Sequence, residues 1–111
     1  MPKHFFHCTD GRSLLLDRAG ETVRAGSKGL QLAFARFAAH AVRDRWPGRE
    51  DWSAWRVHVV DEAGVEVAVV PFEGTPEFLE PGERRRFADR FAGRRRAEPA
   101  RDRTPPAARA A

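Results

Sequence analysis

The chain has 111 residues, which is enough for one domain and too few for two. Hydrophobic residues make up 41% and charged residues 32% of it, the balance of an ordinary soluble protein. No apolar stretch of about 18 residues is present, so we expect no membrane span and no membrane partner. Cys8 is the single cysteine, which excludes an internal disulfide. The chain does not open with a basic segment followed by an apolar one, as a secretory signal does, so we expect a cytoplasmic protein.

The net charge of +4 is distributed unevenly. Residues 1–81 carry 10 basic and 12 acidic residues, whereas residues 82–111 carry 10 arginines and 4 acidic residues. A basic tail on a near-neutral body is typical of an electrostatic handle for nucleic acid or another polyanion. Compositional drift in a GC-rich genome is the other interpretation, because 18 of the 20 basic residues are arginine.

The first part of the chain predicts a β-hairpin. Residues 3–9 are rich in strand formers and lead directly into Asp10-Gly11. An Asp-Gly pair between two apolar runs is a strong hairpin signal, because both turn positions favour a positive φ. Residues 13–16 form the returning strand, and residues 17–23 form a second turn with a short extension.

Residues 27–45 are predicted to form an amphipathic helix. Ser27 is a suitable N-cap, and Pro47-Gly48 ends the helix. Six apolar residues fall at helical spacing on one stripe, which we expect to face the core: Leu30, Phe34, Phe37, Ala38, Ala41 and Val42.

A second hairpin follows, with strands at 55–60 and 65–70 around a turn at 61–64. Strict alternation along the last strand would place Glu66, Ala68 and Val70 on one face. Only one residue of that face is polar, so we expect another chain or the C-terminal segment to cover it.

The rest of the chain is more polar. Residues 74–82 are predicted to be a proline-rich acidic linker, and residues 83–96 a basic helix with Phe87 and Phe91 one turn apart. Residues 97–111 contain mainly Arg, Ala and Pro without apolar periodicity, and we expect them to be disordered.

The predicted fold class is therefore α+β. Residues 1–73 form a two-layer β-β-α-β-β domain, in which one amphipathic helix packs on one face of an antiparallel sheet. A basic C-terminal helix or tail follows. The small core and the apolar second face of the sheet both favour a homodimer.

Several short motifs in this order resemble a family of short bacterial domains of unknown function. They are Met-Pro-Lys-His-Phe-Phe-His, Asp10-Gly11, Asp17-x-x-Gly20, Trp55-Arg56-Val57-x-Val59-x-Asp61-Glu62-x-Gly64 and Val70-Pro71-Phe72. Members typically open with Met-Pro-Arg-Tyr-Phe-Phe and close on a hairpin ending Val-Pro-Phe. The resemblance covers residues 1–73 and implies the fold, but no activity. His4 replaces an aromatic residue that is usual there, and the long basic extension is not associated with the family.

Pro2 is a candidate for catalysis. Methionine removal would expose its secondary amine, which enzymes resembling the tautomerases use as a general base. His7-x-x-Asp10-Gly11-Arg12-Ser13 resembles the opening of that family. In a tautomerase the first strand leads directly into a helix, whereas residues 14–16 and a turn intervene here. We therefore interpret Pro2 as a residue at the start of a strand and expect no enzyme.

Potential metal ligands are His4, His7, His58 and Cys8, all on predicted strands. A metal site needs three or four converging ligands, and alternation places His4 and Cys8 on the face opposite His7. His7 and His58 share a face if their strands are neighbours. We predict no metal and no cofactor.

Other residue groups have a structural and a functional interpretation. Asp10, Asp17 and Asp61 each begin a turn, where an aspartate accepts hydrogen bonds from backbone amides. The tryptophans at positions 46, 52 and 55 form either a stacking platform for bases or the end of a small core, and we expect core packing.

The sequence thus predicts a non-catalytic interaction or dimerisation module. Its interaction face would comprise Ala68, Val70, Phe87 and Phe91. The alternative is a nucleic-acid-associated protein that contacts phosphates through its C-terminal arginines. These arginines are Arg84, Arg85, Arg86, Arg90, Arg94, Arg95 and Arg96. The partners considered are therefore a second copy, another protein or a nucleic acid.

Overall fold

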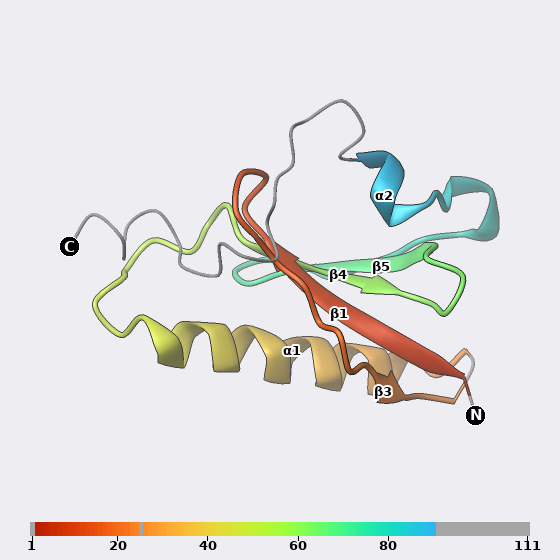
Figure 1. Ribbon diagram of the computed structural model, residues 1–111, viewed down its shortest axis with the longest axis horizontal. Helices are drawn as coiled ribbons and strands as arrows, with labels where there is room; N and C mark the ends of the chain where they lie inside the picture. The colour runs from red at the N-terminus through yellow and green to blue at the C-terminus, as the bar shows by residue number, and fades with distance from the viewer. Residues whose placement is uncertain (1, 25, 91–111) are drawn as a thin grey trace.

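The computed structural model of the protein describes residues 2–24 and 26–90. One antiparallel sheet carries α1 on one face and the segment ending in α2 on the other (Figure 1). The strands occur in the order β2-β1-β4-β5-β6, and β3 also pairs with β1, which confirms the predicted α+β class. The elements are β1 (Lys3–Thr9), β2 (Leu14–Leu15), β3 (Glu21–Thr22), α1 (Lys28–Arg45), β4 (Arg56–Val60), β5 (Glu66–Pro71), β6 (Glu77–Phe78), a 3-10 turn (Pro81–Glu83) and α2 (Phe87–Arg90).

The first hairpin forms at the predicted place but with a different turn. Thr9 of β1 pairs with Leu14 of β2, which leaves a four-residue loop between them. Gly11 has a φ of 94°, whereas no other residue type in the described chain has a positive φ. Asp10 instead accepts hydrogen bonds from the amides of Arg12 and Ser13 through Oδ1. The prediction of two positive φ angles was therefore wrong. In this four-residue loop the Asp10 side chain accepts the hydrogen bonds that stabilise the turn, so only Gly11 needs a positive φ.

β2 and β3 share one edge of β1, and Asp17 fills the gap between them. Its Oδ2 accepts from the Phe6 amide at 3.1 Å, so a side chain completes the hydrogen bonding of the strand edge. Its Oδ1 accepts from Ala19 and Gly20. Gly20 has a φ of 72°, and a Cβ there would lie 2.8 Å from a ring carbon of Phe5. Glycine is therefore required at this return point.

α1 begins and ends where the sequence predicts, but it is rotated relative to the predicted stripe. Ser27 accepts from the Leu30 amide through Oγ, as an N-cap does. The buried residues are Gln31, Ala35, Ala39 and Val42. Leu30 and Phe37, which were expected in the core, are 45% and 71% exposed. Alanine side chains let the helix approach a sheet that already presents Phe6, Trp55 and valines to it.

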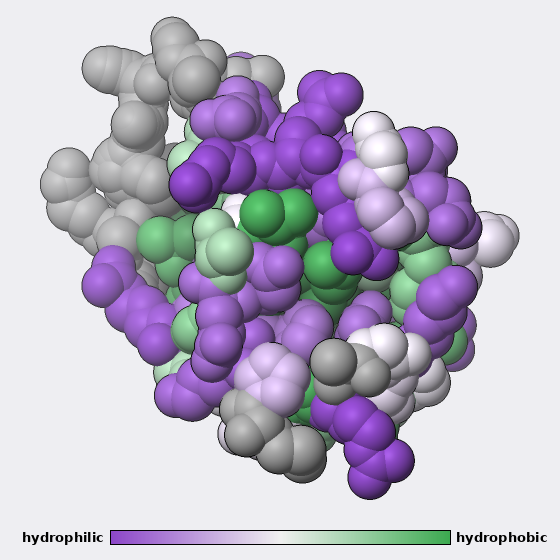
Figure 2. Space-filling view, turned by 90° about the vertical axis from the view of Figure 1, so that its right-hand side faces the viewer, coloured by the Kyte–Doolittle hydropathy of each residue, from purple (hydrophilic) through white to green (hydrophobic). Residues whose placement is uncertain are grey.

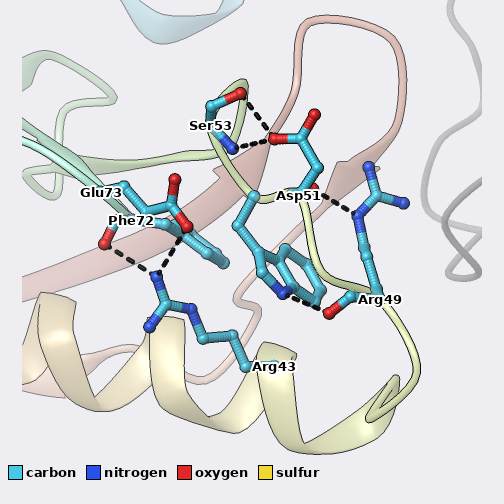
Figure 3. Close-up of polar contacts among 7 residues, drawn as sticks. Arg43, Arg49, Asp51, Ser53, Phe72 and Glu73 are labelled. Atoms are coloured by element: carbon cyan, nitrogen blue, oxygen red, sulfur yellow. Dashed lines mark hydrogen bonds and ion pairs between the residues drawn. The ribbon is translucent and has the colours of Figure 1, made fainter.

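An aromatic cluster closes the core beyond the carboxyl end of α1. The ring of Trp52 lies 5.8 Å from Trp55 and 5.6 Å from Phe72. Trp52 and Trp55 are 5% and 0% exposed, and Trp46 is partly buried against the core, which confirms core packing. Figure 3 shows Arg43 of α1 reaching the Phe72 carbonyl at 3.0 Å, which ties the helix to the end of β5.

A bulge in β5 reverses the faces that strict alternation assigned to it. Val60 pairs with Glu66, but Val59 pairs with Ala68, so Val67 is an extra residue. Ala68 and Val70 consequently lie in the core beside α1, while Glu66 stays on the opposite face. The predicted face of Glu66, Ala68 and Val70 is therefore corrected.

The segment after β5 is more ordered than a linker. β6 pairs with β5 in the register Ala68↔Phe78. Arg85 and Arg86 are extended rather than helical: the Arg85 carbonyl accepts from the Glu66 amide at 2.9 Å, and Arg86 bridges Val65. The predicted helix over 83–96 therefore begins only at Phe87. Its remainder, with Phe91, and the predicted tail at 97–111 lie outside the described residues.

Candidate functional site

Figure 1 shows the segment that ends in α2 over the sheet face opposite α1. Beneath this segment the side chains of His7, His58 and Glu66 form a polar cluster. His7 of β1 pairs directly with His58 of β4, as predicted for neighbouring strands. The Phe87 ring covers both imidazoles, with ring centroids 4.8 Å from His7 and 5.4 Å from His58. The C-terminal segment covers this face at Glu66, whereas Ala68 and Val70, which were expected on the same face, lie against α1 instead.

Glu66 is the centre of this cluster. Its side chain is 0% exposed, and its two oxygens have different partners. Oε1 lies 3.2 Å from His58 Nδ1, and Oε2 accepts from Arg90 Nε at 2.6 Å. Burial acts to raise the pKa of Glu66, but the hydrogen bonds with His58 and Arg90 outweigh burial and hold it below its ordinary value. The carboxylate therefore stays charged and holds Arg90 against the sheet.

His7 is held in its neutral form. Burial lowers its pKa to about 4, although the nearby Asp17 carboxylate acts in the opposite direction. The Asp17 amide donates to His7 Nδ1 at 3.0 Å, and only an unprotonated nitrogen can accept that bond. His7 therefore acts as a structural acceptor that fixes the start of the second turn.

His58 also borders a cavity of about 360 Å³, whose wall includes Arg56, Glu77 and Arg90. A buried carboxylate beside Nδ1 fixes the tautomer and orientation of an imidazole, as in general-base dyads. Here the same carboxylate also anchors Arg90, so the pair serves to dock α2. In the described part of the chain, no three His, Cys, Asp or Glu side chains gather closely enough to hold a metal ion.

The remaining metal-ligand candidates are kept apart by the sheet. His4 and Cys8 lie on the α1 side, as alternation predicts. Burial raises the pKa of the Cys8 thiol to about 12, so it is an inert core residue. Asp61 accepts from the amides of Ala63 and Val65, which confirms the turn role predicted for this aspartate as for Asp10 and Asp17.

The described C-terminal arginines mostly bind their own chain. Arg84 Nε donates to the Leu79 carbonyl at 3.1 Å, and Arg86 donates to the Ala63 carbonyl at 3.3 Å. Arg90 pairs with Glu66, and Arg85 is exposed. Three of these side chains thus hold the segment on the sheet. Arg94, Arg95 and Arg96 lie outside the described residues.

The predicted interaction face is not a surface of this structure. Ala68 and Val70 are 0% and 3% exposed and pack in the core, because the bulge turns them toward α1. Phe87 is 8% exposed and covers the two histidines. Phe91 falls outside the part of the chain that the structure describes.

The exposed apolar surface lies instead along the outer side of α1. Leu30, Ala33, Phe37 and Ala41 are all exposed and follow one another at intervals of three or four residues. We call these four residues the outer face of α1. Three residues of the predicted stripe, Phe34, Ala38 and Val42, pack in or against the core as expected. The other three, Leu30, Phe37 and Ala41, are exposed, because the helix also buries Gln31, Ala35 and Ala39.

The antiparallel sheet with a single long helix on one face defines a small α+β protein. A family model described as "Domain of unknown function (DUF6894)" matches residues 3–73. The chain therefore belongs to this family. The match ends just after β5, so Glu66 and His58 lie within it, whereas Phe87 and Arg90 follow it. No curated protein and no solved structure matches the chain. None of the helices in residues 2–24 and 26–90 is long and apolar enough to cross a membrane.

Proposed function

We propose that this protein is a non-catalytic, cytoplasmic self-association module that forms a homodimer through the outer face of α1. The observation that carries the proposal is the exposure of Phe37, whose side chain is 71% accessible at the middle of an 18-residue helix. A large exposed aromatic residue within an apolar patch favours burial at an interface. Leu30, at 45% exposure, extends the same apolar surface.

The spacing of the outer face suits an antiparallel copy of the same helix. An 18-residue helix is about 27 Å long. If Phe37 packs against Ala33 of the second copy, two-fold symmetry creates the same contact a second time. The small alanine leaves room for the ring, and Leu30 of the second copy lies one turn away.

The charges at the helix ends fit this register. Asp44 lies on the same line of α1 as Phe37, two turns further along, and is exposed. In the antiparallel pairing it falls beside the amino end of the second α1, where a negative charge is favourable. Arg24, which is also exposed and precedes the helix, lies near that end. In this pairing, Asp44 of each copy therefore lies near Arg24 and the positive amino end of α1 of the other copy.

Light scattering coupled to size-exclusion chromatography tests the proposal. Phe37→Glu should convert the dimer into a folded monomer, because Phe37 is exposed in the single chain and exposed sites tolerate substitution within about 0.5 kcal/mol. Ala54→Glu is the matched control, since it adds the same charge at an exposed position beyond the helix. Dimers of equal strength in both variants would exclude the outer face as the interface.

Binding of nucleic acid through the C-terminal arginines is a second candidate, supported by three consecutive exposed arginines at 84–86. Neutralising about 5 phosphates would give a log–log salt slope of about −4 to −5 on duplex DNA. Arg85→Ala is the cleanest variant, because its side chain is exposed while its neighbours bind backbone carbonyls. It should reduce the slope by about 0.9. An unchanged slope would count against contact with phosphates there.

A further inference from the structure

A second cavity, of about 410 Å³, opens at the amino end of α1. The strand β1, the turn between β4 and β5, and the segment from β6 onwards form its other walls. Figure 2 shows this end of the molecule, where apolar surface lies in the middle and hydrophilic residues surround it. The apolar part of the wall comes from Val67, Phe78 and Leu79. The volume is within the range of small-molecule sites.

Two buried polar side chains line this wall, and one of them, His4, has an atom without a hydrogen-bond partner. His4 is 5% exposed, and its Nδ1 has no hydrogen-bond partner. Burial lowers its pKa, against the effect of Asp61 and Glu62, so the ring is neutral and offers one donor and one acceptor. Gln31 is 6% exposed on the buried side of α1 and lines the same cavity. Buried polar groups normally have partners, so a ligand with polar atoms suits this wall.

The cavity also carries opposite charges on different elements. Lys28 in the first turn of α1 and Arg84 after the 3-10 turn are positive. Arg84 uses Nε for the Leu79 carbonyl, which leaves its terminal nitrogens for other partners. Asp61 and Glu62 on the β4–β5 turn are negative and are bound by backbone amides only. The amino end of α1 adds further positive potential.

We propose that this cavity binds a free α-amino acid with an aliphatic side chain. The carboxylate would lie toward Arg84, Lys28 and the amino end of α1, and the ammonium group toward Asp61 and Glu62. The aliphatic side chain would contact the apolar wall, and the His4 ring would gain its missing partner. A purely anionic or purely cationic ligand would leave one pair of wall charges facing a like charge. This site is separate from the outer face of α1 and does not depend on dimer formation.

The test uses the full chain and three probes of matched shape. Leucine is compared with 4-methylpentanoate, which lacks the ammonium group, and with 3-methylbutylamine, which lacks the carboxylate. Binding is followed by the NMR signal of the His4 ring and by calorimetry. Leucine should shift that signal saturably, and each analogue should bind about tenfold more weakly, the loss expected for one charge-assisted contact.

Variants separate a specific site from a general effect. Arg84→Gln should weaken leucine and 4-methylpentanoate binding about tenfold but leave 3-methylbutylamine binding unchanged, because that amine has no carboxylate. His4→Phe should abolish saturable leucine binding while the protein stays folded. Arg18→Gln, exposed on the second turn, is the matched control and should bind as the parent does. Phe37→Glu should also retain binding, which distinguishes this site from the dimer.

Two results would overturn the proposal. One is a His4 ring signal that leucine does not move up to its solubility limit. The other is binding of 4-methylpentanoate or 3-methylbutylamine as tightly as leucine, since the opposed wall charges would then have no role in recognition.

Discussion

Arg90→Ala removes the contact that docks α2 on the sheet. In the parent protein the guanidinium Nε of Arg90 donates to the fully buried Glu66 carboxylate at 2.6 Å. The variant leaves that carboxylate with His58 as its remaining side-chain partner. The expected result is a loss of stability that exceeds the loss from removing the carboxylate itself.

The magnitude follows from the unequal burial of the two charges. Removing one partner of a buried ion pair costs about 3–5 kcal/mol, because the other charge stays buried without compensation. The Arg90 side chain is 39% exposed, so solvent already screens the pair, and about 2–3 kcal/mol is expected. Glu66→Gln leaves an arginine that water can solvate, so it should cost only about 1 kcal/mol.

Urea unfolding of the two variants measures this difference. Arg85→Ala is the matched control, because its side chain is exposed on the same segment, and it should stay within about 0.5 kcal/mol of the parent. A double variant of Glu66 and Arg90 should cost less than the sum of the single changes. Equal unfolding midpoints for Arg90→Ala and Arg85→Ala would refute the assignment of Arg90 as the anchor of α2.

Three further predictions concern the first strand, its edge and the first turn of α1. The pKa of His7 is about 4 when folded and about 6.5 when unfolded, so the unfolded chain binds more protons between these values. Stability should therefore fall by up to about 3 kcal/mol as pH drops from 6.5 to 4, and pH-dependent melting of His7→Gln should show a flatter profile. Gly20→Ala should lower the folding stability by about 1–3 kcal/mol in thermal melting, because its Cβ would contact Phe5. Gly29→Ala is the control: nothing lies near its Cβ and it is in a helix, so it should raise the stability by up to about 1 kcal/mol. Asp17→Ala should cost about 2–3 kcal/mol by urea unfolding, because three backbone amides lose their acceptor; a change below about 0.5 kcal/mol would contradict this role.

Local signals in the sequence were sufficient for the main elements of residues 3–71 and their order. Ser27 and Pro47 mark the ends of α1 because capping and helix termination depend on a few adjacent residues. The aspartates of the turns were predictable for the same reason. Alternation predicted that His7 and His58 share a face if their strands are neighbours, and the structure makes the strands neighbours.

Tertiary packing decided the features that the sequence did not reveal. The bulge at Val67 depends on the pairing of β4 with β5, and it moved Ala68 into the core. The rotation of α1 depends on how much space the sheet leaves, so Phe37 was placed on the wrong side. The docking of residues 77–90 depends on the contact between Glu66 and Arg90, which are 24 residues apart, and local periodicity cannot predict such a contact.

Sedimentation equilibrium of the unaltered chain over a wide concentration range tests the central claim most directly. The chain has a mass of 12.5 kDa, so the account predicts a species of twice that mass that dissociates on dilution. The same measurement on Phe37→Glu should give the monomer throughout. A parent protein that stays monomeric at the highest concentration would contradict self-association through the outer face of α1.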